Sequence, residues 1–343
     1  MSLRVKNIIY SALLLLVMFL VYKYRASQTE PLVAFSGKTM GPIIYNVKYF
    51  DEALRDFQPE VDSLLNVFNL SLNTYIPQSE ISRFNRGESF RYQLPYFYEA
   101  INVSREVFDL TQGAFDPSIG PLINTWGFGY TEGVNKDSTV IDSIRMFIGM
   151  EKILFNKDSV WKKDPRVALD FSASAKGYGV DVVFEYLKNK GLTDIFVEIG
   201  GEVRVGGENR QTGKPWQVGI LHPNSDELNR YPMAIVSLSD QAMATSGNYF
   251  NYHIIDGIKY SHTISPDTGY PIQHPLLSAT VFADDCMRAD ALATALMVLG
   301  HEKAIALIES QAQYEGFLIY NDEKGQIQTY SSPGVASKIK LID

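Results

Sequence analysis

One irregular but strongly apolar segment constrains the fold of this chain most. Residues 111–129 have the sequence TQGAFDPSIGPLINTWGFG, in which glycines and prolines interrupt any regular helix or strand. The segment nevertheless carries large apolar side chains that a solvated loop would not expose: Phe115, Ile119, Leu122, Ile123, Trp126 and Phe128. Such a segment must be packed within the fold, with partners for its backbone groups. It is either the wall of a binding site or a packed connector.

The N-terminus is typical of an export signal or a membrane anchor. Arg4 and Lys6 precede a largely apolar run over residues 8–22, and Lys23 and Arg25 follow it. No cysteine follows the run, which excludes a lipoprotein-type modification, and no small-residue cleavage site stands directly after it. The pattern therefore favours an anchor that is retained.

These features predict a simple domain organisation. Residues 1–25 form a signal or membrane anchor, residues 26–36 a polar linker, and residues 37–343 a single large domain. We expect the anchor to lie in the inner (cytoplasmic) membrane and the globular domain to lie on its periplasmic side.

Composition excludes some classes of partner and of site. The net charge is −8, and no basic cluster interleaved with aromatic residues occurs, so a nucleic-acid partner is not expected. Cys286 is the only cysteine, so the chain forms neither an internal disulfide nor a cysteine-based metal site. A content of 45% hydrophobic residues is sufficient for a full core.

Periodicity predicts helices inserted among runs of strands. Pro59 and Pro95 each open a helical pattern, and further helices are expected over residues 174–190, 285–299 and 302–311. Strands are expected over residues 43–49, 167–171, 193–199, 202–206, 215–221, 233–239, 249–255, 258–264 and 276–283, with Asp256-Gly257 as a hairpin turn. This order favours an α+β fold with mixed, mainly antiparallel sheets.

A late helix carries a candidate cation site. Asp290 and Thr294 lie four residues apart and therefore on one face, and the other positions over 289–298 are apolar. A carboxylate on such a helix needs a counter-charge or a metal, and Mg²⁺ prefers carboxylate and neutral oxygen ligands. The alternative is that Asp290 caps the helix locally while the hydroxyl of Thr294 bonds to a backbone carbonyl.

The segment over residues 169–179 is a candidate phosphate site. It runs from a strand into a helix, its small residues let a ligand approach the backbone, and a helix N-terminus favours negative charge. Lys176 adds a positive head group in the first turn. The segment could equally be a tight packing turn with an exposed lysine.

Two further features are ambiguous. Residues 199–207 carry glycine pairs at both ends of a short strand, which indicates close backbone approach or a bulge. His262 stands where a strand gives way to a turn. It could orient a phosphate, accept a proton near neutral pH, or be a structural group with satisfied hydrogen bonds.

Short motifs follow one another in a particular order along the chain: Thr39-Met40-Gly41, LSLNTY over residues 70–75, SEISR over 79–83, GAFDP over 113–117, Asp170, AKGY over 175–178, GGE over 200–202, TSG over 245–247, Ser261-His262, TGYP over 268–271 and ADALATA over 289–295. This series, from about Thr39 to Gly300, resembles the ApbE family of FAD:protein FMN transferases.

The resemblance implies a fold, a reaction and ligands. It implies a T-fold-like ApbE architecture in an exported or membrane-anchored protein that binds FAD and Mg²⁺. The FMN moiety of FAD is then transferred to a Thr or Ser hydroxyl of a target redox protein, an acceptor flavoprotein subunit, and AMP is released. Asp290 and Thr294 are implied as Mg²⁺ ligands, with the carbonyl of Ala173 as a third.

The resemblance also places residues around FAD: Met40, Tyr75, Ala114, Phe115, Asp116, Asp170, Lys176 and Ile264. Asp116 and Asp170 could each accept a hydrogen bond from adenine or ribose, and the sequence does not distinguish them. We expect Lys176 and Asp290 to stabilise charge in the reaction, and His262 to orient the pyrophosphate or accept the hydroxyl proton. The alternatives are a Mg²⁺-dependent FAD pyrophosphatase, which yields FMN and AMP, and a non-enzymatic FAD-binding carrier.

Overall fold

The computed structural model describes residues 3–26, 31–129, 134, 137–225, 229–248, 252–255 and 258–342. Helix α1 (Leu3–Ala26) contains one window, Leu3–Leu20, that is long and apolar enough to cross a membrane, with a mean hydropathy of 1.8 and no buried part. A signal sequence would meet the same criterion. The structure thus confirms an apolar N-terminal helix, while retention in a membrane stays a prediction.

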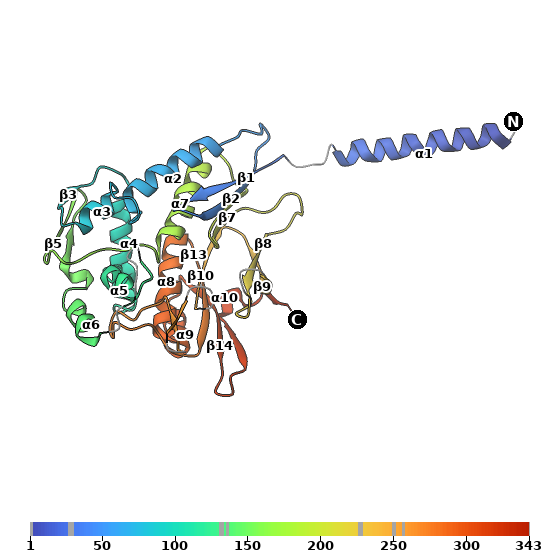
Figure 1. Cartoon of the computed structure of the whole chain (residues 1–343). Coiled ribbons are helices and arrows are strands. Elements are labelled where there is room, and N and C mark those ends of the chain that lie inside the picture. Colours follow the sequence, from blue (N-terminus) through green and yellow to red (C-terminus); the bar gives the residue numbers. More distant parts are fainter. Residues whose placement is uncertain are drawn as a thin grey trace.

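The centre of the fold is one eight-stranded sheet in which all neighbouring strands are antiparallel (Figure 1). Its strands, in spatial order, are β1 (Leu32–Thr39), β2 (Ile43–Phe50), β6 (Ile195–Ile199), β7 (Glu202–Gly206), β10 (Gln241–Gly247), β13 (Leu276–Ala283), β14 (Glu315–Asn321) and β15 (Ile327–Ser331). The predicted α+β class with mainly antiparallel sheets is confirmed.

Helices cover one face of this sheet (Figure 1). Helices α7 (Ala175–Asn189) and α8 (Cys286–Leu299) lie against the strands and against each other, α2 (Gln58–Leu72) packs on α7, and α4 (Phe97–Leu110) packs on α8. Helix α9 (His301–Glu309) packs on β14. Alternate residues of the strands face these helices and form the larger core, for example Val197, Ala244 and Val281.

A second, smaller sheet covers the other face. It has the order β16-β9-β8, from β16 (Ile339–Leu341), β9 (Pro232–Leu238) and β8 (Trp216–Leu221), and the short helix α10 (Pro333–Ala336) lies against β14. A separate core fills the space between the two sheets: Phe50, Val203, Val205, Trp216, Ile220, Met243, Phe282 and Phe317 are among its buried residues. The sheet is therefore buried on both faces.

A third region packs beside the helices. It contains α3 (Glu80–Asn85), α5 (Gly120–Thr125), α6 (Ser138–Arg145), the 3₁₀ helix η1 (Met150–Lys152), the small sheet of β3 (Phe90–Arg91), β5 (Ser159–Lys162) and β4 (Ile153–Phe155), and the hairpin of β11 (Tyr252–Ile255) and β12 (Ile258–Ser261). The predicted turn of this last hairpin, Asp256-Gly257, lies outside the described residues. Trp126 is fully buried here, stacks on Tyr260 and donates a hydrogen bond to the carbonyl of Gly269 at 2.9 Å.

The structure corrects the prediction for the segment 111–129. Residues 120–125 form the short helix α5, because Pro121 stands in its first turn, where its missing N–H is not needed. The apolar side chains of the segment are packed as expected, with Leu122 and Trp126 in a third buried cluster.

Several strand predictions also differ from the structure. Residues 241–247 were not predicted to be a strand, yet they form the central strand β10. Its small side chains, such as Ala242 and Ala244, let α8 pack closely against it, and this packing outweighs the weak strand propensity of alanine. Residues 167–171 make only one isolated bridge, between Ile119 and Ala168, and are not a strand of any sheet. Residues 32–36 of the predicted linker belong to β1, where Phe35 packs on Tyr45.

The N-terminus of α8 is fixed by a carboxylate from α7. Asp181 accepts hydrogen bonds from the backbone N–H groups of Cys286 and Met287, at 2.9 and 2.8 Å, and forms an ion pair with Arg204 at 2.8 Å. Asp285 caps the same helix by accepting from the N–H of Arg288. Helix starts leave such N–H groups without internal partners, so Asp181 both satisfies them and sets the position of α8 against α7.

We predict that Asp181→Ala lowers the free energy of unfolding by about 3 kcal/mol, because it leaves two buried N–H groups and the half-buried Arg204 without this partner. Urea denaturation measures the change. Glu185→Ala is the matched control, since it removes the more exposed partner of Arg204 and should cost less than about 1 kcal/mol. Equal losses in the two variants would contradict this role of Asp181.

Candidate functional site

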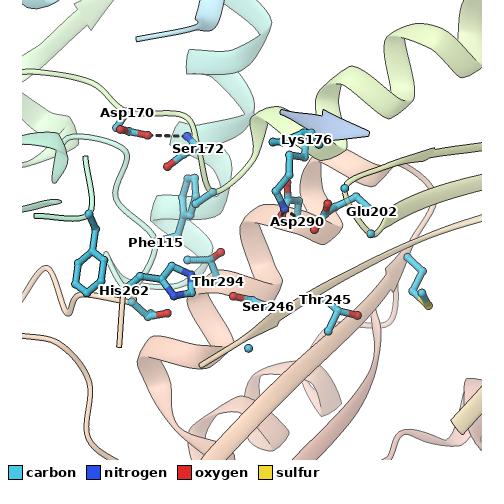
Figure 2. A pocket seen from close by; sticks show the side chains of 18 of the residues that line it. Phe115, Asp170, Ser172, Lys176, Glu202, Thr245, Ser246, His262, Asp290 and Thr294 are labelled. Carbon is cyan, nitrogen blue, oxygen red and sulfur yellow. Dashed lines mark hydrogen bonds and ion pairs between the residues drawn. The ribbon is translucent and has the colours of Figure 1, made fainter. Parts of the chain in front are cut away.

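A cavity of about 920 Å³ opens at one end of the central sheet. One wall comes from the segment 114–119 and the loop after residue 170, and the other from β2, the end of β6 and β8. Between them lie the β6–β7 turn, the end of β10 and the face of α8 that carries Asp290, Thr294 and Val298 (Figure 2). The volume lies within the range typical of small-molecule sites.

Three charged side chains meet on one side of this cavity. The Nζ of Lys176 lies 2.6 Å from Oε1 of Glu202 and 3.9 Å from Oδ1 of Asp290 (Figure 2). Both carboxylates are buried, Glu202 being 2% and Asp290 3% exposed. The second oxygen of Asp290 accepts a hydrogen bond from the backbone N–H of Gly177 at 3.0 Å. The sequence therefore brings Lys176 and Asp290 together, as predicted for one site.

Glycines at two places in the chain make this arrangement possible. A Cβ at Gly177 would collide with the carbonyl oxygen of Cys286 and would lie 2.8 Å from Cβ of Asp290, so only glycine lets α7 approach α8 this closely. Gly200 and Gly201 both have positive φ and form a two-residue hairpin turn between β6 and β7, immediately before Glu202. The first glycine pair is thus a turn, not a bulge.

Burial and charge act in opposite directions on these groups. Burial raises the pKa of Glu202 to about 8 and raises that of Asp290, while the ammonium of Lys176 works against both shifts. Burial lowers the pKa of Lys176, but the carboxylates of Asp290 and Glu202 raise it by more, so the net shift is upward and the side chain stays an ammonium.

The oxygen atoms here fit a hard divalent cation. Oε2 of Glu202 is buried and has no hydrogen-bond partner among the described residues. The hydroxyl of Thr294 lies on the same face of α8 as Asp290, and Ala173 also lines the cavity. Within the described ranges no three His, Cys, Asp or Glu side chains lie together as a metal cluster. A cation here would combine carboxylate oxygens of Asp290 or Glu202 with neutral oxygens, as Mg²⁺ accepts.

The local-cap alternative for Asp290 is wrong. Asp285, not Asp290, caps α8, and the carboxylate of Asp290 accepts its hydrogen bond from another helix. No hydrogen bond from the hydroxyl of Thr294 to a helix carbonyl occurs in the part of the chain that the structure describes. The role of these residues and of Ala173 as metal ligands stays a prediction.

The structure brings most of the predicted FAD residues into this cavity and leaves two outside it. The residues that line it are Ala114, Phe115, Asp116, Asp170, Lys176 and Ile264. Tyr75 is 68% exposed in the turn after α2 and does not line the cavity. Met40 is half-buried against the larger core. The assignment of these residues to FAD stays a prediction.

The two aspartates of the wall differ in environment. Asp116 is buried and accepts a hydrogen bond from the N–H of Ser118 at 2.8 Å, and burial raises its pKa to about 6. Asp170 is half-buried, accepts from the N–H of Ser172 at 2.7 Å, and is tied to the segment 111–129 by its own N–H, which donates to the carbonyl of Pro117. Both present carboxylate oxygens from fixed loops.

His262 lies on the wall that the hairpin β11–β12 leads into. It follows directly on β12, lines the cavity, and its ring is 6.4 Å from that of Phe128 in an edge-on arrangement (Figure 2). The structure therefore places the imidazole in the same cavity as Lys176 and Asp290.

Several lining residues were missed by sequence reasoning. Glu202 belongs to a quoted motif but was given no role; it is the first residue of β7, directly after the glycine turn, and no local signal marks it as buried. Thr245 and Ser246 lie at the end of β10, the strand that was not predicted. Glu198 and Gly219 lie on neighbouring walls through tertiary structure alone, and no local signal marks them.

Solved structures with a similar fold are described as flavin-transferring enzymes. A structure described as flavin transferase ApbE from Vibrio cholerae matches with a TM-score of 0.79 and 37% identity, covering 89% of this chain and 98% of that one. The apo form of the flavinyl transferase ApbE from Pseudomonas stutzeri matches with a TM-score of 0.77 and 34% identity, covering 89% and 95%.

The chain belongs to the ApbE family, whose sequence profile matches residues 40–318. A curated relative from Vibrio cholerae, named FAD:protein FMN transferase, is 40% identical over 287 residues, which are 81% of this chain and 84% of the relative. The protein of the same name from Escherichia coli K12 is 31% identical over 312 residues, with 87% and 86% covered. The resemblance stated from the motifs is confirmed.

We predict that Gly177→Ala lowers the free energy of unfolding by about 2 kcal/mol, because the added methyl group must push α7 away from α8. Urea denaturation measures this. Gly179→Ala on the same helix is the matched control: its Cβ would meet only the ends of flexible side chains, Met40 Cε at 3.0 Å and Ile199 Cδ1 at 3.2 Å, and the better helix propensity of alanine offsets that contact. A neutral Gly177→Ala would contradict the close-approach argument.

The raised pKa of Asp116 predicts that the stability of the wild type falls relative to that of Asp116→Asn as the pH rises. Its pKa is about 6 in the folded protein against an ordinary value of 3.8, so folding favours its protonated form and stability is lost as the pH rises between these values. The free energy of unfolding of Asp116→Asn, taken relative to that of the wild type, should therefore rise by up to about 3 kcal/mol between about pH 4 and about pH 8.

Urea denaturation of the metal-free, flavin-free protein at both pH values measures this difference. Asp267→Asn, at an exposed position, is the control. A difference between Asp116→Asn and wild type that is constant with pH, or that shrinks as the pH rises, would contradict the assignment.

Proposed function

We propose that this chain is an FAD:protein FMN transferase that attaches FMN from FAD to a Thr or Ser hydroxyl of an acceptor redox protein and releases AMP. Membership of the ApbE family and relatives of that name support the activity. The observation that carries the proposal for the site is the buried cluster of Lys176, Glu202 and Asp290 in one cavity with Asp116, Asp170 and His262.

The reaction exchanges one phosphorus–oxygen bond for another. The acceptor hydroxyl oxygen attacks the phosphorus on the FMN side of the pyrophosphate, and the bond from that phosphorus to the oxygen bridging to AMP breaks. AMP leaves with that bond's electron pair, and the hydroxyl proton passes to a base. Because both phosphates are anionic, the barrier is mainly electrostatic, and positive charge held in a water-poor cavity lowers it.

The chain's own groups supply part of that charge. The ammonium of Lys176 and the N-terminus of α7 both face the cavity, so each favours a bound pyrophosphate. Asp290, Thr294 and the carbonyl of Ala173 would hold Mg²⁺, which when bound neutralises phosphate charge and stabilises the leaving group. Glu202 holds the head group of Lys176 in place.

His262 is the proposed acceptor of the hydroxyl proton or orienting group for the pyrophosphate. An imidazole titrates near neutral pH and can take a proton from an attacking hydroxyl. Its position in the cavity supports both roles.

We propose that the N-terminal helix anchors the enzyme in the inner (cytoplasmic) membrane, with the domain on the periplasmic side. The charged flanks of the apolar run, and the length and hydropathy of α1, support an anchor. Fractionation of cells expressing the full chain, followed by protease treatment of spheroplasts, tests both parts of this proposal.

We predict that Asp290→Asn lowers the rate of Mg²⁺-dependent FMN transfer about a hundredfold or more, because a neutral amide oxygen holds the cation much more weakly than a carboxylate. The assay combines full-length protein, FAD, Mg²⁺ and a candidate redox subunit, and mass spectrometry follows the gain of FMN by the subunit and the release of AMP.

Asp284→Asn is the matched control, because Asp284 is exposed and lies outside this cavity near the start of the same helix. Transfer at the wild-type rate by Asp290→Asn would overturn the metal site. Release of AMP and free FMN at the same rate with and without a subunit would identify a pyrophosphatase, and FAD binding with no AMP release at all would identify a carrier.

A further inference from the structure

The transfer proposed above requires a second substrate, a protein segment that brings its hydroxyl into the cavity. Extended peptide segments are commonly bound by pairing with the free edge of a sheet, where main-chain hydrogen bonds hold them in register. A sheet edge that serves this reaction must therefore reach the cavity.

Strand β8 is the edge strand that meets this condition. It is the last strand in the order β16-β9-β8, and Gly219, Ile220 and Leu221 at its end line the cavity. The outer strands of the central sheet, β1 and β15, contribute no residue to the cavity, and neither do the strands of the hairpin β11–β12 in the part that the structure describes.

Hydrogen bonds on the other side of β9 show which way the backbone of β8 points. The N–H of Ser237 donates to the carbonyl of Lys338 in the loop before β16 at 3.0 Å, so Ser237 faces β16 and not β8. Its partner in β8 is Gln217, and two residues further Gly219 is paired with Ile235. Backbone groups alternate along an antiparallel strand, so the N–H and C=O groups of Gln217 and Gly219 point away from β9.

These outward groups are open to solvent. Gln217 and Gly219 are exposed, and no backbone hydrogen bond to the outward groups of either residue is formed within the described ranges. A Cβ built on Gly219 would have only Pro232 near it, at 3.4 Å, so the backbone there is accessible. An exposed edge of this kind is a template for pairing with another chain.

We propose that an extended segment of the acceptor protein pairs with the free edge of β8 through the backbone of Gln217 and Gly219, and so delivers its Ser or Thr hydroxyl into the cavity. The proposal rests on the proposed transferase function. Gly219 presents no side chain, so the incoming backbone can approach closely at the mouth of the cavity. Main-chain pairing depends on an extended conformation of the bound segment more than on its sequence. A loop or a terminus of the acceptor can adopt that conformation.

The test uses Gln217→Pro in the full-length protein. Proline removes the outward N–H and is tolerated at edge positions, so the pairing of β8 with β9 remains. Gln217→Thr is the matched control, because it loses the same side-chain hydrogen bonds to Pro215 and Ser237 but keeps the N–H. The acceptor is the redox subunit that the wild type flavinylates in the assay above.

We expect Gln217→Pro to lower kcat/KM for the acceptor about tenfold or more, with KM for FAD and the melting temperature close to those of Gln217→Thr. Equal transfer rates in the two variants would overturn the edge-pairing proposal and leave the transferase function intact. If the wild type flavinylates no redox subunit, the transferase function fails, and this proposal fails with it.

Amide hydrogen exchange on the wild type provides a test that needs no variant. With FAD, Mg²⁺ and an acceptor whose reactive hydroxyl residue is replaced by alanine, the amides of Gln217 and Gly219 should exchange about tenfold more slowly, whereas Val218 is already protected by β9. If FAD alone slows the exchange of these amides, the edge belongs to the flavin site, and the proposal is overturned. If the exchange slows as the protein concentration rises without acceptor, the edge binds a second copy of this chain, and the proposal is likewise overturned.

Discussion

The close approach of α7 to α8 is the constraint on which the site depends. Gly177 allows the two helices to meet, its N–H donates to Asp290, and Asp181 one turn later fixes the first N–H groups of α8. The same contact that packs two core helices therefore positions Lys176 and Asp290 from segments more than a hundred residues apart. Fold stability and site geometry here share one set of hydrogen bonds, so neither can change without the other.

This packing leaves acidic oxygens in the cavity without a full set of partners. Two buried carboxylates, Asp290 and Glu202, face a single ammonium, and one oxygen of Glu202 has no partner among the described residues. Burial favours the protonated form of both acids, so a divalent cation bound here would displace a proton, and the proposed pyrophosphate would be attracted by that cation and by Lys176. Under the proposed function, the same residues would account for affinity for a metal and for a dinucleotide.

The sequence predicted the fold class and many of the elements because their signals are local. The amphipathic helix α2, with Pro59 in its first turn, and the alternation of β2 appear where expected, whereas α4 begins at Phe97, two residues after the Pro95 that was expected to open it. Strand β10 was missed because close packing against α8 requires small residues there, and small residues such as alanine have a low strand propensity. The segment 167–171 alternates like a strand, but its Leu169 N–H bonds to the side chain of Asn85 and not to a ladder.

The two walls of the cavity differ in how far a sequence can reveal them. One wall presents side chains with distinctive chemistry, Asp116, Asp170 and His262, on loops whose glycines and prolines form motifs. The other presents the bare backbone of Gly219 in β8 beside ordinary side chains such as Glu198 and Ile220, and a backbone amide has no signature in the sequence. A surface that binds a partner by its main chain becomes visible only when pairing and strand order are known. For this reason the proposed flavin side of the site is visible in sequence motifs, whereas the proposed acceptor side is visible only in the three-dimensional structure.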